Sequence, residues 1–147
     1  MNTNDESMTR EQIEEMNKRA DEALAEVDRI ARVVADAVAD GVLVDCTVDT
    51  DCQWWLALTR AAHADCVAWT DGVTYWRERH EQMRMQQLVD MLLHAVRVRG
   101  ADVDVVPFRV LRIPHGGDTP EVRELTMRVH GSWLIVTLPG ETDPLSA

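Results

Sequence analysis

Four side chains that bind zinc in other proteins occur within a stretch of 21 residues. They are Cys46, Cys52, His63 and Cys66. Thiolate sulfur and imidazole nitrogen are ordinary zinc ligands, and all four must come within about 2.3 Å of the metal. The sequence predicts a continuous helix over 52–69, which would hold Cys52 and Cys66 about 21 Å apart. We therefore expect inert thiols, neither a metal site nor a Cys52–Cys66 disulfide.

Acidic and histidine side chains form no recognised catalytic or calcium-binding pattern. Asp45, Asp49 and Asp51 resemble part of a calcium loop, but the glycine and the closing glutamate of such a loop are missing. His115 opens the loop 115–118, yet no Ser, Cys or Lys nucleophile accompanies it at a recognised spacing. We therefore predict no catalytic residue, no metal and no cofactor, and a protein that is not an enzyme.

Most of the aromatic side chains lie between residues 54 and 76. Trp55, Leu58 and Trp69 have the spacing of one helix face, which favours a helical-hairpin core over the alternative of a tryptophan-walled ligand pocket. Adjacent residues cannot face the same core, so Trp54 is a candidate contact for a partner.

Six arginines would suit a winged-helix DNA-binding domain, in which a reader helix precedes a β-hairpin wing. They are Arg77, Arg79, Arg84, Arg112, Arg123 and Arg128. Acidic residues interleave with these arginines, and the chain carries a net charge of −11, which repels phosphate groups. A transcription regulator is therefore an alternative, and we do not expect nucleic-acid binding.

A long amphipathic helix is predicted to precede all of these residues. Thr9 and Gln12 have the spacing of a capping box, and the helix meets no Gly or Pro before Gly41. The predicted segment is 9–41, with the helix itself at about 10–39. Apolar residues occupy the a and d positions of four heptads: Ile13, Met16, Ala20, Ala23, Val27, Ile30, Val34 and Ala37. This pattern is typical of a coiled coil.

The apolar stripe changes its width along this helix. It is narrow at its start and is widened further on by flanking apolar residues: Leu24, Ala31, Val33 and Val38. We infer that the C-terminal half packs on the chain's own domain. We expect Ile13, Met16 and Ala20 to contact a partner. The alternative is that the whole helix lies along its own domain.

The rest of the sequence predicts an α+β domain over 42–138. A helical hairpin is expected from helices at 52–69 and about 74–99, although 67–76 also fits a β-hairpin around Asp71-Gly72. Alternating apolar residues over 102–138 predict an antiparallel sheet of three or four strands with helices on one face. The polar ends are predicted to be flexible tails: 1–8 and 139–147.

The final strand, over 132–138, is apolar on both faces. A strand of this kind needs cover on both sides. We expect the helices to cover one face and a second subunit or partner to cover the other, so Trp133 and Ile135 join Trp54 as candidate partner contacts.

Charge and cysteine content restrict the compartment and the class of role. Most of the negative charge falls in residues 1–52, and the sequence has no apolar run long enough for a membrane span and no signal-peptide pattern. We expect a cytoplasmic protein with reduced thiols and no membrane contact. A single lysine among 15 basic residues suggests a genome of high GC content, as in actinobacteria and their phages.

These observations predict a self-associating interaction or assembly protein without catalytic activity. We expect a homo-oligomer or a complex with a protein partner, formed through the N-terminal coiled coil, and a phage structural or host-interacting role fits the composition. The alternative in the same class is an acidic inhibitor that binds a basic protein surface through this helix.

Overall fold

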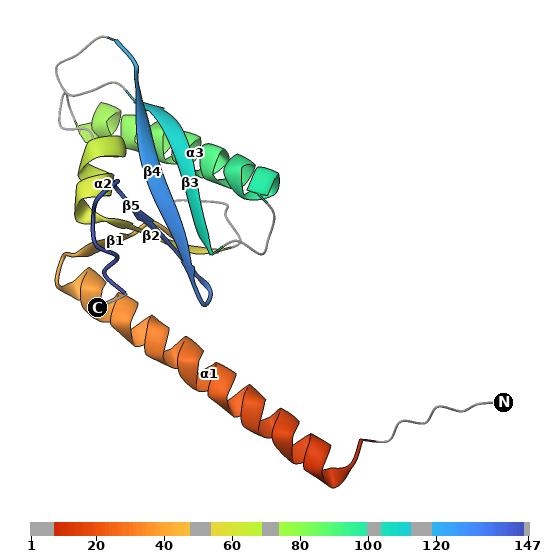
Figure 1. The fold of residues 1–147 in the computed structure, drawn as a ribbon. Helices are drawn as coiled ribbons and strands as arrows, with labels where there is room; N and C mark the ends of the chain where they lie inside the picture. Colours follow the sequence, from red (N-terminus) through yellow and green to blue (C-terminus); the bar gives the residue numbers. More distant parts are fainter. Residues whose placement is uncertain (1–7, 48–53, 69–73, 100–103, 113–118, 146–147) are drawn as a thin grey trace.

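The computed structural model describes residues 8–47, 54–68, 74–99, 104–112 and 119–145, with the side chains of 74–78 excepted. The fold is α+β, as predicted, and Figure 1 shows a long helix that extends from a compact body. The elements in chain order are α1 (Arg10–Ala39), β1 (Leu43–Asp45), β2 (Trp55–Thr59), α2 (Arg60–Cys66), α3 (Thr74–Arg99), β3 (Val105–Arg112), β4 (Glu121–His130) and β5 (Trp133–Thr137).

The strands form one five-stranded sheet with the order β1-β2-β5-β4-β3. β2 and β5 are parallel, whereas the other neighbouring pairs are antiparallel. The prediction of a purely antiparallel sheet of three or four strands is therefore wrong in strand number and in direction. The additional strands are β1 and β2, which precede the predicted sheet in the sequence.

The helix predicted over 52–69 is correct only for residues 60–66, so the predicted helical hairpin is reduced to the short α2 and the long α3. Residues 55–59 form β2, and Thr59 is the N-cap of α2, a helix of only seven residues. Leu56, Ala57 and Leu58 are all fully buried, because β2 is an inner strand with both faces covered. An apolar run of this kind fits a doubly buried strand as well as a helix face. The helix over 74–99 is observed as α3.

Two hydrophobic clusters lie on opposite faces of the sheet. The larger cluster joins α2 and α3 to the sheet, and the smaller cluster joins the C-terminal half of α1 to the other face. The residues of the smaller cluster are Ile30, Val34, Leu43, Ala57 and Ile135. The second face of β5 is thus covered by the chain's own first helix, which corrects the expectation of helices on one face only.

The segment after β5 is held against the sheet, although 139–147 was predicted to be a flexible tail. Asp143 is buried, and its Oδ2 lies 2.7 Å from Nε2 of His130 on β4. Glu141 accepts hydrogen bonds of 2.7 Å from the Thr59 hydroxyl and from the backbone N–H of Leu138. The contacts with Thr59 and His130 come from residues distant in the sequence, so the local composition does not indicate them.

Candidate functional site

The N-terminal half of α1 is exposed to solvent on every side. All residues from 8 to 29 are exposed, and Ile30 is the first buried residue of the helix. Ile13 is 47% exposed and Met16 is 54% exposed, and Ala20 lies in the same exposed stretch. Figure 1 shows that this half of α1 extends beyond the sheet. The three predicted contacts on the helix are therefore all accessible to a partner.

Local interactions alone support this exposed half. The Thr9 hydroxyl accepts from the N–H of Gln12, and the Gln12 side chain accepts from the N–H of Thr9, so the predicted capping box is present. Ion pairs one turn apart follow along the surface: Arg10–Glu14, Glu15–Arg19 and Glu26–Arg29. Pairs of this kind stabilise a helix slightly, because residues one turn apart are neighbours on its surface. They maintain the helix without covering its apolar residues.

The apolar stripe continues without a break from the exposed half into the buried half. Ile30 and Val34 belong to the same a and d positions as Met16 and Val27, but they are buried against the sheet. Val27, one heptad before Val34, is 39% exposed. One stripe thus serves as core at its C-terminal end and is open to solvent at its N-terminal end.

The predicted aromatic contacts lie together at one end of the central strands. Trp54 is 45% exposed, and the rings of Trp55 and Trp133 pack at a centroid distance of 5.5 Å. Trp133 is partly buried and packs against the cluster beneath α1. Ile135 is fully buried in that cluster, so it is not accessible to a partner, which corrects its assignment. Its cover is α1, which the sequence pattern did not place on this face.

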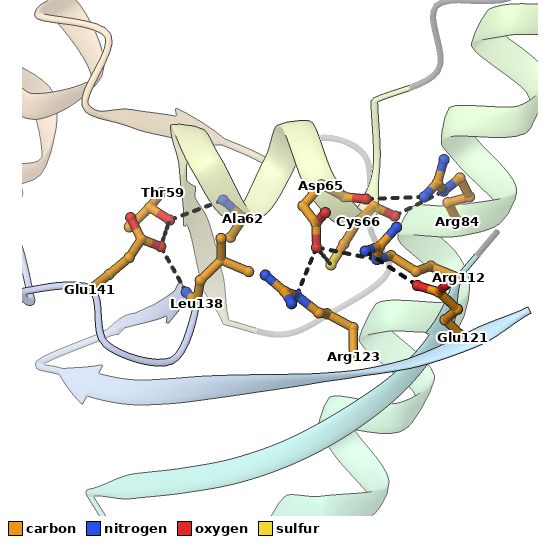
Figure 2. A network of polar contacts seen from close by, with 10 residues as sticks. All are labelled: Thr59, Ala62, Asp65, Cys66, Arg84, Arg112, Glu121, Arg123, Leu138 and Glu141. Carbon is orange, nitrogen blue, oxygen red and sulfur yellow. Dashed lines mark hydrogen bonds and ion pairs between the residues drawn. The ribbon is translucent and has the colours of Figure 1, made fainter. Parts of the chain in front are cut away.

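A polar network that sequence reasoning missed lies at the C-terminal end of α2. Asp65 Oδ2 lies 2.9 Å from Nε of Arg123 on β4 and 3.2 Å from Nε of Arg112 on β3. Figure 2 shows both guanidinium groups directed towards this carboxylate. Glu121 lies farther away, at 3.8 Å from Arg112. One carboxylate therefore balances two arginines and fastens a short helix to two strands.

Arg84 on α3 holds the same end of α2 through backbone contacts. Its guanidinium group donates to the carbonyls of Asp65, Cys66 and Ala68 at 3.2, 2.9 and 3.3 Å. These carbonyls lie at the negative end of the helix, where a cation is favoured. Burial lowers the pKa of Arg84 relative to its ordinary value. Arg84 thus completes an anchor between α2, α3 and the sheet.

The polar network around Asp65 fastens α2 to the rest of the domain. The thiol of Cys66, which lies in this network, is not activated as a nucleophile. Cys66 is buried, and burial, together with the adjacent Asp65 carboxylate, raises the pKa of its thiol to about 11. Nucleophilic cysteines have lowered pKa values, because the thiolate is the reactive species. The arrangement therefore favours a structural role for Cys66.

We expect Cys66 to resist alkylation by iodoacetamide at about pH 8 in the native protein and to react after denaturation in urea. Its raised pKa also favours the folded state, because the folded chain retains the proton. This contribution is present below the pKa of the unfolded thiol and is lost as the pH rises towards about 11. Mass spectrometry of the alkylated peptides measures the reaction. Rapid native labelling of Cys66 would contradict the structural role.

Replacement of Asp65 by asparagine is expected to lower the free energy of unfolding by about 2 kcal/mol, because two arginines lose their counter-charge. The side chain of Arg112 is only 14% exposed, whereas that of Arg123 is 40% exposed. Solvent can therefore stabilise the charge of Arg123 in part when the carboxylate is removed, but not that of Arg112. The Glu121→Gln variant is the control, since its side chain is 59% exposed, and we expect a loss below about 0.5 kcal/mol. Equal urea midpoints for the two variants would contradict the anchoring role.

Four of the six arginines that suited a DNA reader contact groups of the chain itself. Arg84, Arg112 and Arg123 belong to the α2 anchor, and Arg128 contacts Thr137 and Asp143 at 3.2 and 4.0 Å. This arrangement gives no support to the winged-helix alternative. The interleaved spacing of these arginines with acids was the signal that could have indicated internal ion pairs.

The candidate zinc ligands do not form a cluster in the part of the chain that is described. Cys46 and Cys66 are buried thiols of the larger hydrophobic cluster, and the described residues contain no group of three potential metal ligands. The predicted separation of Cys52 and Cys66 loses its basis, because residues 55–59 form a strand and not a helix. Cys52 lies outside the described residues, as do Asp49, Asp51, Asp71-Gly72 and the loop 115–118.

No helix in the described ranges is long and apolar enough to cross a membrane. No family model, curated protein or solved structure matches the chain.

Proposed function

We propose that this chain is a self-associating assembly protein without catalytic activity and that its copies meet through the exposed half of α1. The observation that carries the proposal is the open apolar stripe over residues 13–27, which continues directly into the stripe that packs on the sheet. A helix face of this composition is normally covered in a folded protein.

The exposed half of α1 supports association on energetic grounds. Its residues from 10 to 29 are all exposed, whereas most of the stability of helices in proteins comes from the packing of an amphipathic face. Full burial of a side chain such as Ile13, Met16 or Val27 contributes about 1.5–3 kcal/mol. A partner along the stripe would therefore stabilise a helix that its own domain leaves uncovered.

A second copy is the partner that best suits this surface. Two-fold association requires one patch that is complementary to itself. The stripe has small side chains at its middle, Ala20 and Ala23, and larger ones towards its ends, so two copies can approach closely at the centre.

The charges along α1 favour self-association over the acidic-inhibitor alternative. The exposed half carries seven acidic and four basic residues over 10–29, and its arginines form ion pairs within the helix, as at Arg10–Glu14 and Glu15–Arg19. An inhibitor that binds a basic surface would need a more uniformly negative face. Mixed charge beside an apolar stripe is instead typical of helices that pair with each other.

Sedimentation velocity of the full chain tests this proposal. We expect the sedimentation coefficient to rise from the monomer value at low micromolar concentration to a dimer or larger species at high micromolar concentration. Because apolar burial carries the contact, added salt should not dissociate the complex. A constant monomer value across this range would overturn the proposal, and dissociation by moderate salt would favour an electrostatic contact.

A further inference from the structure

The sheet lies on the same side of α1 as the open stripe. Ile30 and Val34 face β1, β2 and β5, and the preceding stripe residues, Val27 and Ala23, belong to the same heptad series. A straight helix drifts by about 20° per heptad relative to such a series. Over the two heptads between Ala20 and Val34 the stripe therefore turns by only about 40°. The side that a partner helix must occupy is thus already filled by the domain at the C-terminal end of α1.

This arrangement conflicts with an in-register parallel pair of helices. In such a pair residues 30–38 of each copy would lie beside residues 30–38 of the other, on the stripe side. That space already holds the sheet, and the β4–β5 turn is in close contact with the helix there. A β-carbon built on Gly131, in this turn, would lie only 3.1 Å from Cδ1 of Ile30. A continuous helix from Arg10 to Ala39 offers no break at which the partner could diverge.

We propose that the exposed halves of α1 pair antiparallel about a two-fold axis near Ala20, so that the two domains lie at opposite ends of the pair. This inference rests on the proposed function, and it specifies the partner's direction. Residues 13–27 then face the same residues of the other copy, and each domain lies beyond the N-terminal end of the partner's helix. The separation also limits repulsion between two chains that each carry a net charge of −11.

Single cysteines at three stripe positions distinguish the two directions. The full-length variants are Ile13→Cys, Ala20→Cys and Val27→Cys, each combined with Cys52→Ser, and the Cys52→Ser protein alone is the control for Cys46 and Cys66. Each variant is treated with a short bis-maleimide linker at a concentration at which sedimentation shows association. In the antiparallel pair the two copies of residue 13 are about 21 Å apart along the axis, as are those of residue 27.

We expect Ala20→Cys to form a cross-linked dimer and the other two variants to remain uncross-linked. A mixture of Ile13→Cys and Val27→Cys should form a mixed dimer, which intact mass identifies. Self-cross-linking of all three variants would show parallel pairing, which overturns this inference and leaves self-association through α1 in place. An associated protein in which neither a single variant nor the mixture cross-links would overturn both proposals, because the copies would then meet elsewhere.

Discussion

The double variant Ile13→Asp/Met16→Asp is expected to remain monomeric at concentrations at which the wild-type chain associates, with its fold intact. Two carboxylates in the stripe would lose hydration on association, and the cost is several kcal/mol when no counter-charge is present. In the isolated chain both positions are about half exposed, so the domain tolerates the substitutions. Sedimentation velocity measures association, and urea denaturation monitored by tryptophan fluorescence measures the stability of the domain.

The Lys18→Asn/Ala25→Asp variant provides a charge-matched control. It adds the same two units of negative charge on the side of α1 opposite to the stripe, where both residues are exposed. We expect this variant to associate as the wild type does. Equal dissociation of both variants would show that net charge, and not the stripe, governs association. Unfolding of the Ile13→Asp/Met16→Asp variant would refute the division of α1 into a core half and a partner half.

Replacement of Val34 by aspartate is expected to lower the free energy of unfolding by about 3 kcal/mol or more, enough to unfold a domain of ordinary stability in part or completely. Val34 is a residue of α1 that is 1% exposed, and it packs against the strands β1, β2 and β5. A carboxylate at this position would be buried without a cation in the cluster. Urea denaturation and circular dichroism measure the loss.

The matched control for this variant is Val27→Asp, the same substitution one heptad earlier on the same stripe. Because Val27 is 39% exposed, we expect the domain to lose less than about 1 kcal/mol, while self-association is weakened. The two positions should therefore show opposite effects on fold and on assembly. A stable Val34→Asp domain would contradict the packing of α1 on the sheet.

Local patterns were sufficient to predict the elements in which the apolar residues recur at one clear spacing, either that of a helix or that of a strand. The capping box at Thr9 and the uninterrupted stripe defined α1, and the division between its exposed and buried halves lies between Arg29 and Ile30. Apolar alternation likewise identified the region of β3, β4 and β5. In α1 and β3 the side chains on one face carry most of the information, because burial differs strongly between the faces, whereas β5 was recognised by its continuous apolar run.

The segment 54–59 could not be assigned from its pattern. Its apolar residues fit the spacing of a strand and the spacing of a helix equally well. The strand β2 lies between β1 and β5, and its side chains are buried on both faces of the sheet. The parallel β2–β5 pairing joins residues about 80 positions apart, such as Leu56 and Leu134. No local rule predicts a partner at that distance, and the helix wrongly assigned to this segment also underlay the predicted separation of Cys52 and Cys66.

The candidate site was predictable only where it is local. Ile13, Met16 and Ala20 follow from heptad spacing within one helix. The Asp65 anchor depends on arginines from α3, β3 and β4, which only the tertiary fold brings together. The open side of the stripe also depends on the fold, because the sheet covers α1 from Ile30 onward and leaves the preceding residues uncovered.

Hydrogen exchange of the wild-type chain, followed peptide by peptide at low and high micromolar concentration, tests the central claim most directly. The method locates a contact without any substitution, and amides of an uncovered helix exchange through local opening. We predict that amides over residues 13–27 become strongly protected at the higher concentration, while those of α3 and β5 change little. Protection that is independent of concentration over 13–27, or that rises elsewhere in its place, would contradict self-association through the exposed half of α1.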